Sequence, residues 1–205
     1  PSKLVSWQNL SFQTVHVTCF ELSQTWPVMK TTFLLGALSA TLGAVLALII
    51  SYLTTRKAVS GHKVLGFLAT APIAIPGIVL GVGLFLSYTR PPVILYGTLW
   101  ILLLAYITIE LPAAYQQMNS AFGSVHPELE EAGRILGANR LTTLARITAP
   151  LLRASVIATW CFIFVAVVRE LSAAAILFTS DTKVLSVLIF DLKESGDLGA
   201  IAVLG

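Results

Sequence analysis

The densest group of side chains that could do chemistry is acidic: Glu128, Glu130 and Glu131 follow Pro127 within a polar stretch. No catalytic pattern accompanies them. The chain has no GxxxxGK(S/T) phosphate loop, no HExxH, no GxSxG and no paired carboxylates inside an apolar run. Its cysteines and histidines show no metal-ligand spacing. The sequence therefore predicts no catalytic centre, no metal site and no cofactor on this chain, and any ATP energy must come from another polypeptide.

Composition explains why so few polar groups are available. Hydrophobic residues make up 56% of the 205 residues and charged residues 11%, against roughly 45–50% and about 25% in soluble domains. So little charge cannot cover a water-soluble globule, and so apolar a chain does not stay disordered. No basic run exceeds Arg56-Lys57, so nucleic acid is not an expected partner. These observations exclude a soluble enzyme or a secreted binding domain.

Long uncharged runs predict an all-α protein, a polytopic bundle of transmembrane helices. Crossing the hydrocarbon core of a bilayer takes roughly 20 helical residues. We expect spans at about 31–53, 64–88, 93–112 and 151–173, and a truncated one from about 198. The fourth span includes Arg153 and Arg169 because long side chains at helix ends can reach the interface. Pro1 and the cut end at Gly205 suggest a piece of a longer membrane protein.

The orientation of these spans follows from lysine and arginine, which favour cytoplasmic loops. Residues 54–63 carry three basic side chains and no acid, and residues 116–153 carry four arginines. After the fourth span, acidic residues outnumber basic ones. We therefore expect residues 54–63 and 116–153 on the cytoplasmic side of the membrane, with residues 1–29 and 171–197 outside.

The second span carries two prolines four residues apart, Pro72 and Pro76, followed by Gly77 and Gly81. Each proline removes a backbone donor and clashes with the preceding turn, so a kink is expected near Pro76. The glycines form a GxxxG face that allows a second helix to approach closely. Two interpretations stand side by side: a kinked packing helix, or a broken helix that lines a pathway.

The cytoplasmic stretch predicts a helix–turn–helix elbow. Pro127 suits the first position of a helix, and the three glutamates suit its first turn. Gly137 is expected to take the left-handed conformation that ends this helix, and Asn139 to cap a second one that Pro150 stops. The apolar stripes of the two helices are Leu129, Ala132, Gly133, Leu136, and then Leu141, Leu144, Ala145, Thr148. Such short helices must pack against this protein or a partner.

At this point the residues resemble a family. Glu131-Ala132-Gly133, Gly137, Ile147 and Ala149-Pro150 have the spacing of the EAA loop of binding-protein-dependent ABC-importer permeases. Gly133 and Ala149 depart from that pattern, where a second Ala and a Leu are usual; both are small and apolar, so we expect looser packing. The proline-rich second span resembles the same permeases. So do Tyr96–Trp100, Leu111-Pro112 and Arg169–Ser172, the last of which, with Val184–Leu192 and Gly196-Asp197, is closest to the ferric-iron branch.

The resemblance implies a type I importer permease in the inner membrane of a bacterium, not an enzyme. Its elbow would be a coupling helix docked on a cytoplasmic ABC ATPase subunit. Residues 1–29 would be an amphipathic lead-in outside the membrane. The chain would be most of the second half of a two-half permease, without its last helix. Expected partners are the ATPases, a periplasmic or lipid-anchored solute-binding protein, a second permease half or copy, and the bilayer. Ferric iron is the expected solute; phosphonate, thiamine, sulfate and polyamine permeases share the same frame.

Two sets of candidate site residues follow. The set expected to couple to the ATPase is Glu131, Ala132, Gly133, Gly137, Ile147 and Pro150. The set expected to line the translocation pathway is Pro72, Pro76, Gly77, Glu110, Arg169 and Glu170. Glu110 lies near the end of the predicted third span, where a structural pairing, for example with Arg153, is the alternative. Arg169 and Glu170 are neighbours and point in different directions on a helix, so we do not expect them to pair.

Two rival functions remain. A secondary transporter driven by an ion gradient would need titratable side chains deep within the spans, and apart from Glu110 the three long runs have none. A membrane-embedded enzyme would need a catalytic constellation, which the sequence does not show. Both rivals are therefore disfavoured relative to a permease.

Overall fold

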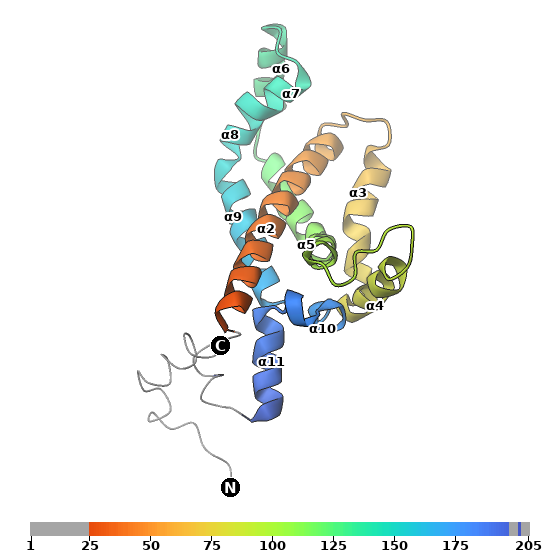
Figure 1. Ribbon diagram of the computed structural model, residues 1–205. Coiled ribbons are helices and arrows are strands. Elements are labelled where there is room, and N and C mark those ends of the chain that lie inside the picture. The colour runs from red at the N-terminus through yellow and green to blue at the C-terminus, as the bar shows by residue number, and fades with distance from the viewer. Residues whose placement is uncertain (1–24, 197–200, 202–205) are drawn as a thin grey trace, which may run out of the picture. The chain divides into compact units, whose positions relative to one another are not determined.

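The computed structural model describes residues 25–196 and residue 201, and every regular element in that part of the chain is helical (Figure 1). The longer helices are α2 (Thr25–Thr55), α3 (His62–Thr70), α4 (Gly77–Tyr88), α5 (Leu99–Phe122), α6 (Pro127–Ile135), α9 (Arg153–Arg169) and α11 (Leu185–Ser195). The shorter ones are η3 (Ala71–Ala74), α7 (Arg140–Thr143), η4 (Leu144–Thr148), α8 (Ala149–Leu151), α10 (Ala174–Leu177) and η5 (Ser180–Thr182). The predicted lead-in, apart from its last five residues, and all but one residue of the predicted fifth span lie outside the described residues.

Two helices, α2 and α5, are each long and apolar enough to cross a membrane. Two more spans are possible if helices on either side of a short break are counted together: α3 and η3 with α4, and η4 and α8 with α9. This matches the number of complete spans expected from the uncharged runs.

The second predicted span is broken rather than bent. η3 ends at Ala74, Ile75 is extended with φ −105° and ψ 117°, and α4 begins only at Gly77. Pro76 cannot donate a hydrogen bond, and its ring disfavours a helical conformation at the residue before it. The two prolines therefore have the effect expected of them, and the gap they leave is a full interruption of the helix.

The bounds of the third predicted span are wrong at both ends. Residues 93–98 form a loop, in which the backbone N–H groups of Leu95 and Tyr96 donate to the carbonyl of Tyr88 at 3.0 and 3.2 Å. The helix then continues through Pro112 to Phe122. Residues beyond the proline have packing partners that offset the lost hydrogen bond: Ser51 Oγ donates to the carbonyl of Tyr115, and Met118 is fully buried.

α9, which covers Arg153–Arg169, is shorter than the fourth predicted span. α9 ends just before Glu170, whose side-chain Oε1 accepts a hydrogen bond from the N–H of Ala173 at 3.1 Å. At the other end, Leu152 takes a non-helical conformation, and the helical axis bends by 73° between η4–α8 and α9.

The described chain divides into two compact units. The first comprises the described parts of 1–35, 78–103 and 168–205. Within it, the hydroxyl of Thr32 accepts the N–H of Leu185, which fixes the start of α11 against α2. A Cβ on Gly81 would lie 3.3 Å from the Cα of Ala173, so this glycine permits the close backbone approach that the GxxxG pattern predicts.

The second unit comprises residues 36–77 and 104–167. Polar contacts connect the last turns of α2 to α5: Tyr115 OH donates to Thr54 Oγ1 at 3.1 Å, and Thr55 Oγ1 donates to Asn119 Oδ1 at 2.7 Å. A buried apolar cluster lies beside them and consists of Tyr52, Phe122, Val125 and Leu152. This cluster and these contacts hold the end of α2 against α5.

Candidate functional site

The elbow forms as the sequence predicts up to its last turn. α6 begins at Pro127, and Gly137 lies at φ +88°, the left-handed conformation that ends a helix. The side chain of Asn139 accepts the N–H of Thr142 at 2.8 Å and so caps the next helix. The predicted stop at Pro150 is wrong: the chain stays helical through η4, a π-helical turn, and α8, and the break comes at Leu152. Pro150 is the second residue of α8, which follows directly on η4.

Two of the EAA-loop positions meet across the elbow. A Cβ placed on Gly133 would overlap with Cδ1 of Ile147, so α6 and η4 touch at the point where the family pattern has an alanine. The overlapping atom is the far end of a flexible side chain. The side chain of Ile147 thus fills the space that a Cβ at position 133 would take, and the expected looser packing stays a prediction.

The outer face of α6 is exposed. Glu131 and Ala132 are exposed, and the side chains of Ile135 and Leu136 at its C-terminal end are 85% and 88% exposed. Of the predicted stripe on α6, only Gly133 is partly covered. We call Glu131, Ala132, Ile135 and Leu136 the tip of the elbow. Apolar side chains this exposed are typical of surfaces that meet another molecule.

The opposite face of α6 is anchored by a residue that the sequence analysis missed. Glu130 is buried, and its Oε1 accepts hydrogen bonds from Arg56 Nε at 3.0 Å and from Thr148 Oγ1 at 3.1 Å. The Arg56 and Glu130 side chains are 15% and 8% exposed. A nearly buried ion pair with an additional hydrogen bond is held far more firmly than a surface pair.

Arg56 has further contacts that place it firmly. Its Nη2 donates to the carbonyl of Val125 at 2.8 Å, and its guanidinium lies 5.9 Å from the centre of the Phe122 ring. Arg140 adds a second attachment, since its Nη1 donates to the carbonyl of Ala58 at 2.6 Å. We call Arg56, Glu130, Thr148 and Arg140 the base of the elbow. It joins α6, α7 and η4 to the end of α2 and the residues just after it.

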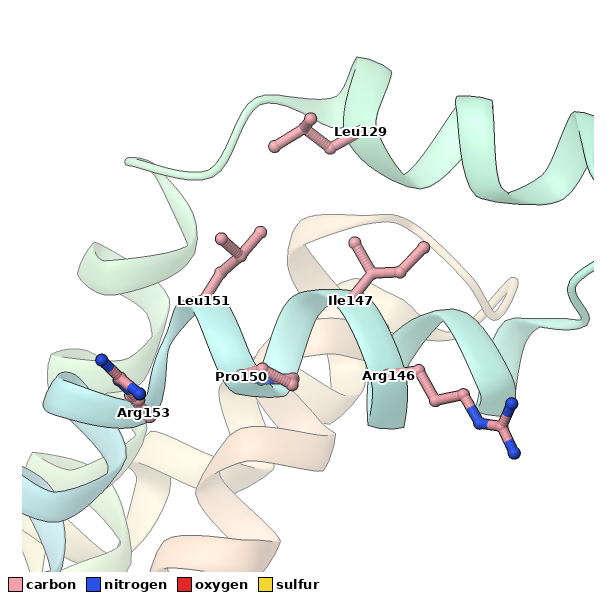
Figure 2. A pocket seen from close by; sticks show the side chains of 6 residues that line it. All are labelled: Leu129, Arg146, Ile147, Pro150, Leu151 and Arg153. Carbon is pink, nitrogen blue, oxygen red and sulfur yellow. The ribbon is translucent and has the colours of Figure 1, made fainter.

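A hollow of about 630 Å³ opens between α6 and the η4–α8 segment. Figure 2 shows Leu129 on α6 facing Ile147 and Leu151, with Arg146 and Arg153 at opposite ends of the row. Pro150, another residue of the predicted coupling set, also lines it. The hollow therefore combines an apolar floor with a positive charge at each end.

The residues predicted to line the pathway are divided between the two compact units. Pro72, Pro76 and Gly77 surround the break between η3 and α4. Glu110 lies midway along α5, because the helix runs past Pro112. Arg169 is exposed and ends α9, whereas the carboxylate of Glu170 accepts the N–H of Ala173. The last two belong to the other unit, and their roles stay predictions.

The described part of the chain has no group of three or more His, Cys, Asp or Glu side chains that could hold a metal ion. Among the described residues, then, the elbow is the feature with the most distinctive geometry. What it can do is present a rigid, partly apolar surface to another molecule.

Comparison of the structure with solved proteins shows the class to which this helical fold belongs. The crystal structure of a bacterial alginate ABC transporter, in complex with an alginate pentasaccharide-bound periplasmic protein, contains a similar chain with a TM-score of 0.72 and 22% identity. The similarity covers 96% of this chain and 76% of that one. The fold is thus that of ABC transporter permeases, as the sequence predicts.

Comparison of the sequence identifies the family. The family described as "Binding-protein-dependent transport system inner membrane component" matches residues 39–205. The chain belongs to this family of inner-membrane components of transport systems.

Curated relatives refine the comparison. The ferric transport system permease protein FbpB of Actinobacillus pleuropneumoniae is 30% identical over 180 residues, which are 88% of this chain and 26% of that protein. The putative 2-aminoethylphosphonate transport system permease protein PhnV of Salmonella paratyphi A is 25% identical over 180 residues, 87% of this chain and 68% of that protein. This chain spans about a quarter of the length of the ferric relative.

Proposed function

We propose that this chain is part of the permease subunit of an ATP-driven importer and that the elbow couples it to a separate ABC ATPase. The observation that carries the proposal is the exposed tip: Glu131, Ala132, Ile135 and Leu136 stand clear of the protein on a helix whose other face is anchored. A carboxylate beside two large apolar side chains suits a groove with a basic or backbone donor at its edge. ATP binds to that partner, not to this chain.

The remaining partners follow from the same proposal. Residues 54–63 and the elbow lie on the cytoplasmic side, as the excess of Lys and Arg predicts. A periplasmic or lipid-anchored solute-binding protein meets the opposite side, and a second permease half or copy completes the pathway within the bilayer. Family membership favours this assembly over an ion-driven secondary transporter.

We propose ferric iron as the solute. Support comes from the relative at 30% identity, a ferric transport permease, and from the Arg169–Ser172 motif noted in the sequence. The phosphonate transport relative at 25% identity keeps a second solute class in view. Uptake of radiolabelled ferric iron by a deletion strain carrying the full-length protein tests the choice. Iron uptake that stays at the level of the deletion strain, with 2-aminoethylphosphonate uptake restored, would overturn it.

Co-purification tests the coupling role. The tagged full-length protein is extracted from membranes, and its bound ATPase is quantified for the wild type and for Glu131→Ala with Leu136→Ser. We expect at least about a tenfold loss of bound ATPase, since a few central residues carry most of an interface's affinity.

Glu194→Ala is the matched control, because Glu194 is also exposed, at the end of α11 on the side predicted to face outward. It should leave the bound ATPase unchanged. The proposal is wrong if the tip variant inserts normally and still retains its ATPase.

A further inference from the structure

The base of the elbow is built to keep the elbow and the end of α2 together. Glu130 connects α6 to Arg56, the residue after the end of α2, and the same carboxylate oxygen accepts from Thr148 on η4. Both helical arms of the elbow therefore converge on one buried carboxylate. Arg140 makes an independent attachment from α7 to the carbonyl of Ala58 in the same loop.

The receiving side of these contacts is itself held by further contacts. Arg56 also bonds to the carbonyl of Val125, and the last turns of α2 are connected to α5 through Tyr115 and Asn119. Tyr52 and Phe122 pack beside them with ring centres 6.2 Å apart. α2 then runs as a single helix from Thr55 back to Thr25. A displacement of the elbow thus reaches a continuous helix through these polar contacts.

We propose that Glu130 and Arg56 form the tie that transmits movement of the elbow to α2, so that the elbow and the end of α2 move as one body. Glu130 is a positioning residue: it lies on the face of α6 opposite the tip and has no part in docking. This inference rests on the proposed function. It assigns the two steps of coupling, docking and transmission, to two neighbouring glutamates. Glu131 contacts the ATPase, and Glu130 converts the contact into movement of the membrane helix.

The first test separates transmission from docking. The full transporter is assembled in proteoliposomes with its solute-binding protein and ATP, and both ATP hydrolysis and solute uptake are measured. Glu130→Gln should keep its bound ATPase and its hydrolysis, while solute taken up per ATP falls by roughly tenfold or more, because the buried pair is lost. A merely structural role predicts something different: hydrolysis and uptake would fall in the same proportion, and that result overturns the proposal.

The second test replaces the ion pair with a covalent tie. Arg56→Cys and Glu130→Cys are combined in a background without other cysteines. A short bifunctional thiol reagent with reducible attachments joins the two cysteines, because the arginine and glutamate side chains that they replace are longer than cysteine. Uptake should be low in the uncross-linked pair, recover on cross-linking and fall again on reduction.

The other outcomes are equally informative. Loss of uptake on cross-linking would mean that the tie must open during transport, and equal uptake before and after it would mean that no tie is needed; either overturns the proposal. Failure of cross-linking to restore uptake, with the ATPase still bound, overturns it as well. Absence of any bound ATPase in the wild type contradicts the proposed function instead.

Discussion

Glu130 and Glu131 are adjacent on one helix, yet they occupy opposite environments. Glu130 is buried against Arg56 and Thr148, whereas Glu131 is exposed beside Ala132. The difference separates the elbow into a base that belongs to this protein and a tip available to another. The EAA-loop motif contains Glu131 only. It therefore does not identify Glu130, the neighbouring residue whose carboxylate anchors the helix.

The strongest test of this comparison removes the charge of Glu130 at the base of the elbow. Glu130→Gln leaves the charge of Arg56 nearly buried and unpaired, and we expect it to cost about 3 kcal/mol, the lower end of the range for breaking a buried pair. Hydrogen exchange of the amides of residues 127–148 measures the loss as weaker protection of the elbow. Glu131→Gln is the matched control and should leave that protection unchanged. Equal losses in the two variants would erase the distinction between base and tip.

A smaller change at the same place asks what the arginine contributes beyond its charge. Arg56→Lys keeps the charge but cannot reach Glu130 Oε1 and the Val125 carbonyl together, so we expect a loss of about 1–2 kcal/mol. The amides of residues 125–130 should show it in hydrogen exchange. Combined with Glu130→Gln, the loss should be less than the sum of the two, because the variants share one interaction. Strict additivity would show that the pair is not coupled.

The turn between the arms is the next feature to test. Gly137→Ala forces an alanine to φ +88° and should destabilise the elbow by about 1 kcal/mol. No atom lies within 4 Å of the Cβ it would gain, so the cost comes from the backbone alone. Gly61→Ala is the control, since Gly61 has equal space and an ordinary φ of −89°. Susceptibility to limited proteolysis should rise in the first variant only.

The smallest effect on stability is expected at the tip. Leu136→Ser should change the free energy of unfolding by no more than about 0.5 kcal/mol, because the side chain is 88% exposed and loses almost no packing. The same variant should nevertheless lose bound ATPase on co-purification. Measuring thermal unfolding and co-purification on one preparation shows the separation directly. A marked drop in thermal stability would place Leu136 in the base instead.

Local signals in the sequence were enough to predict the outline of the elbow. Pro127, Gly137 and Asn139 act through backbone geometry and capping, which depend on a few neighbouring residues, and the structure confirms all three. The break near Pro76 is local for the same reason. Where the prediction relied on a local stop signal against tertiary packing, it was wrong: helices continue through Pro112 and Pro150.

The sequence by itself determined the class of protein and several of the positions where helices start, break and end, because hydropathy, charge and turn chemistry act over short stretches. Only the tertiary structure decided which glutamate is anchored. Glu130 and Arg56 are 74 residues apart in the chain, and no periodicity connects them. Burial of a carboxylate depends on what folds against it, and three glutamates in one helical turn look alike until a distant arginine and a threonine from the second arm of the elbow meet one of them.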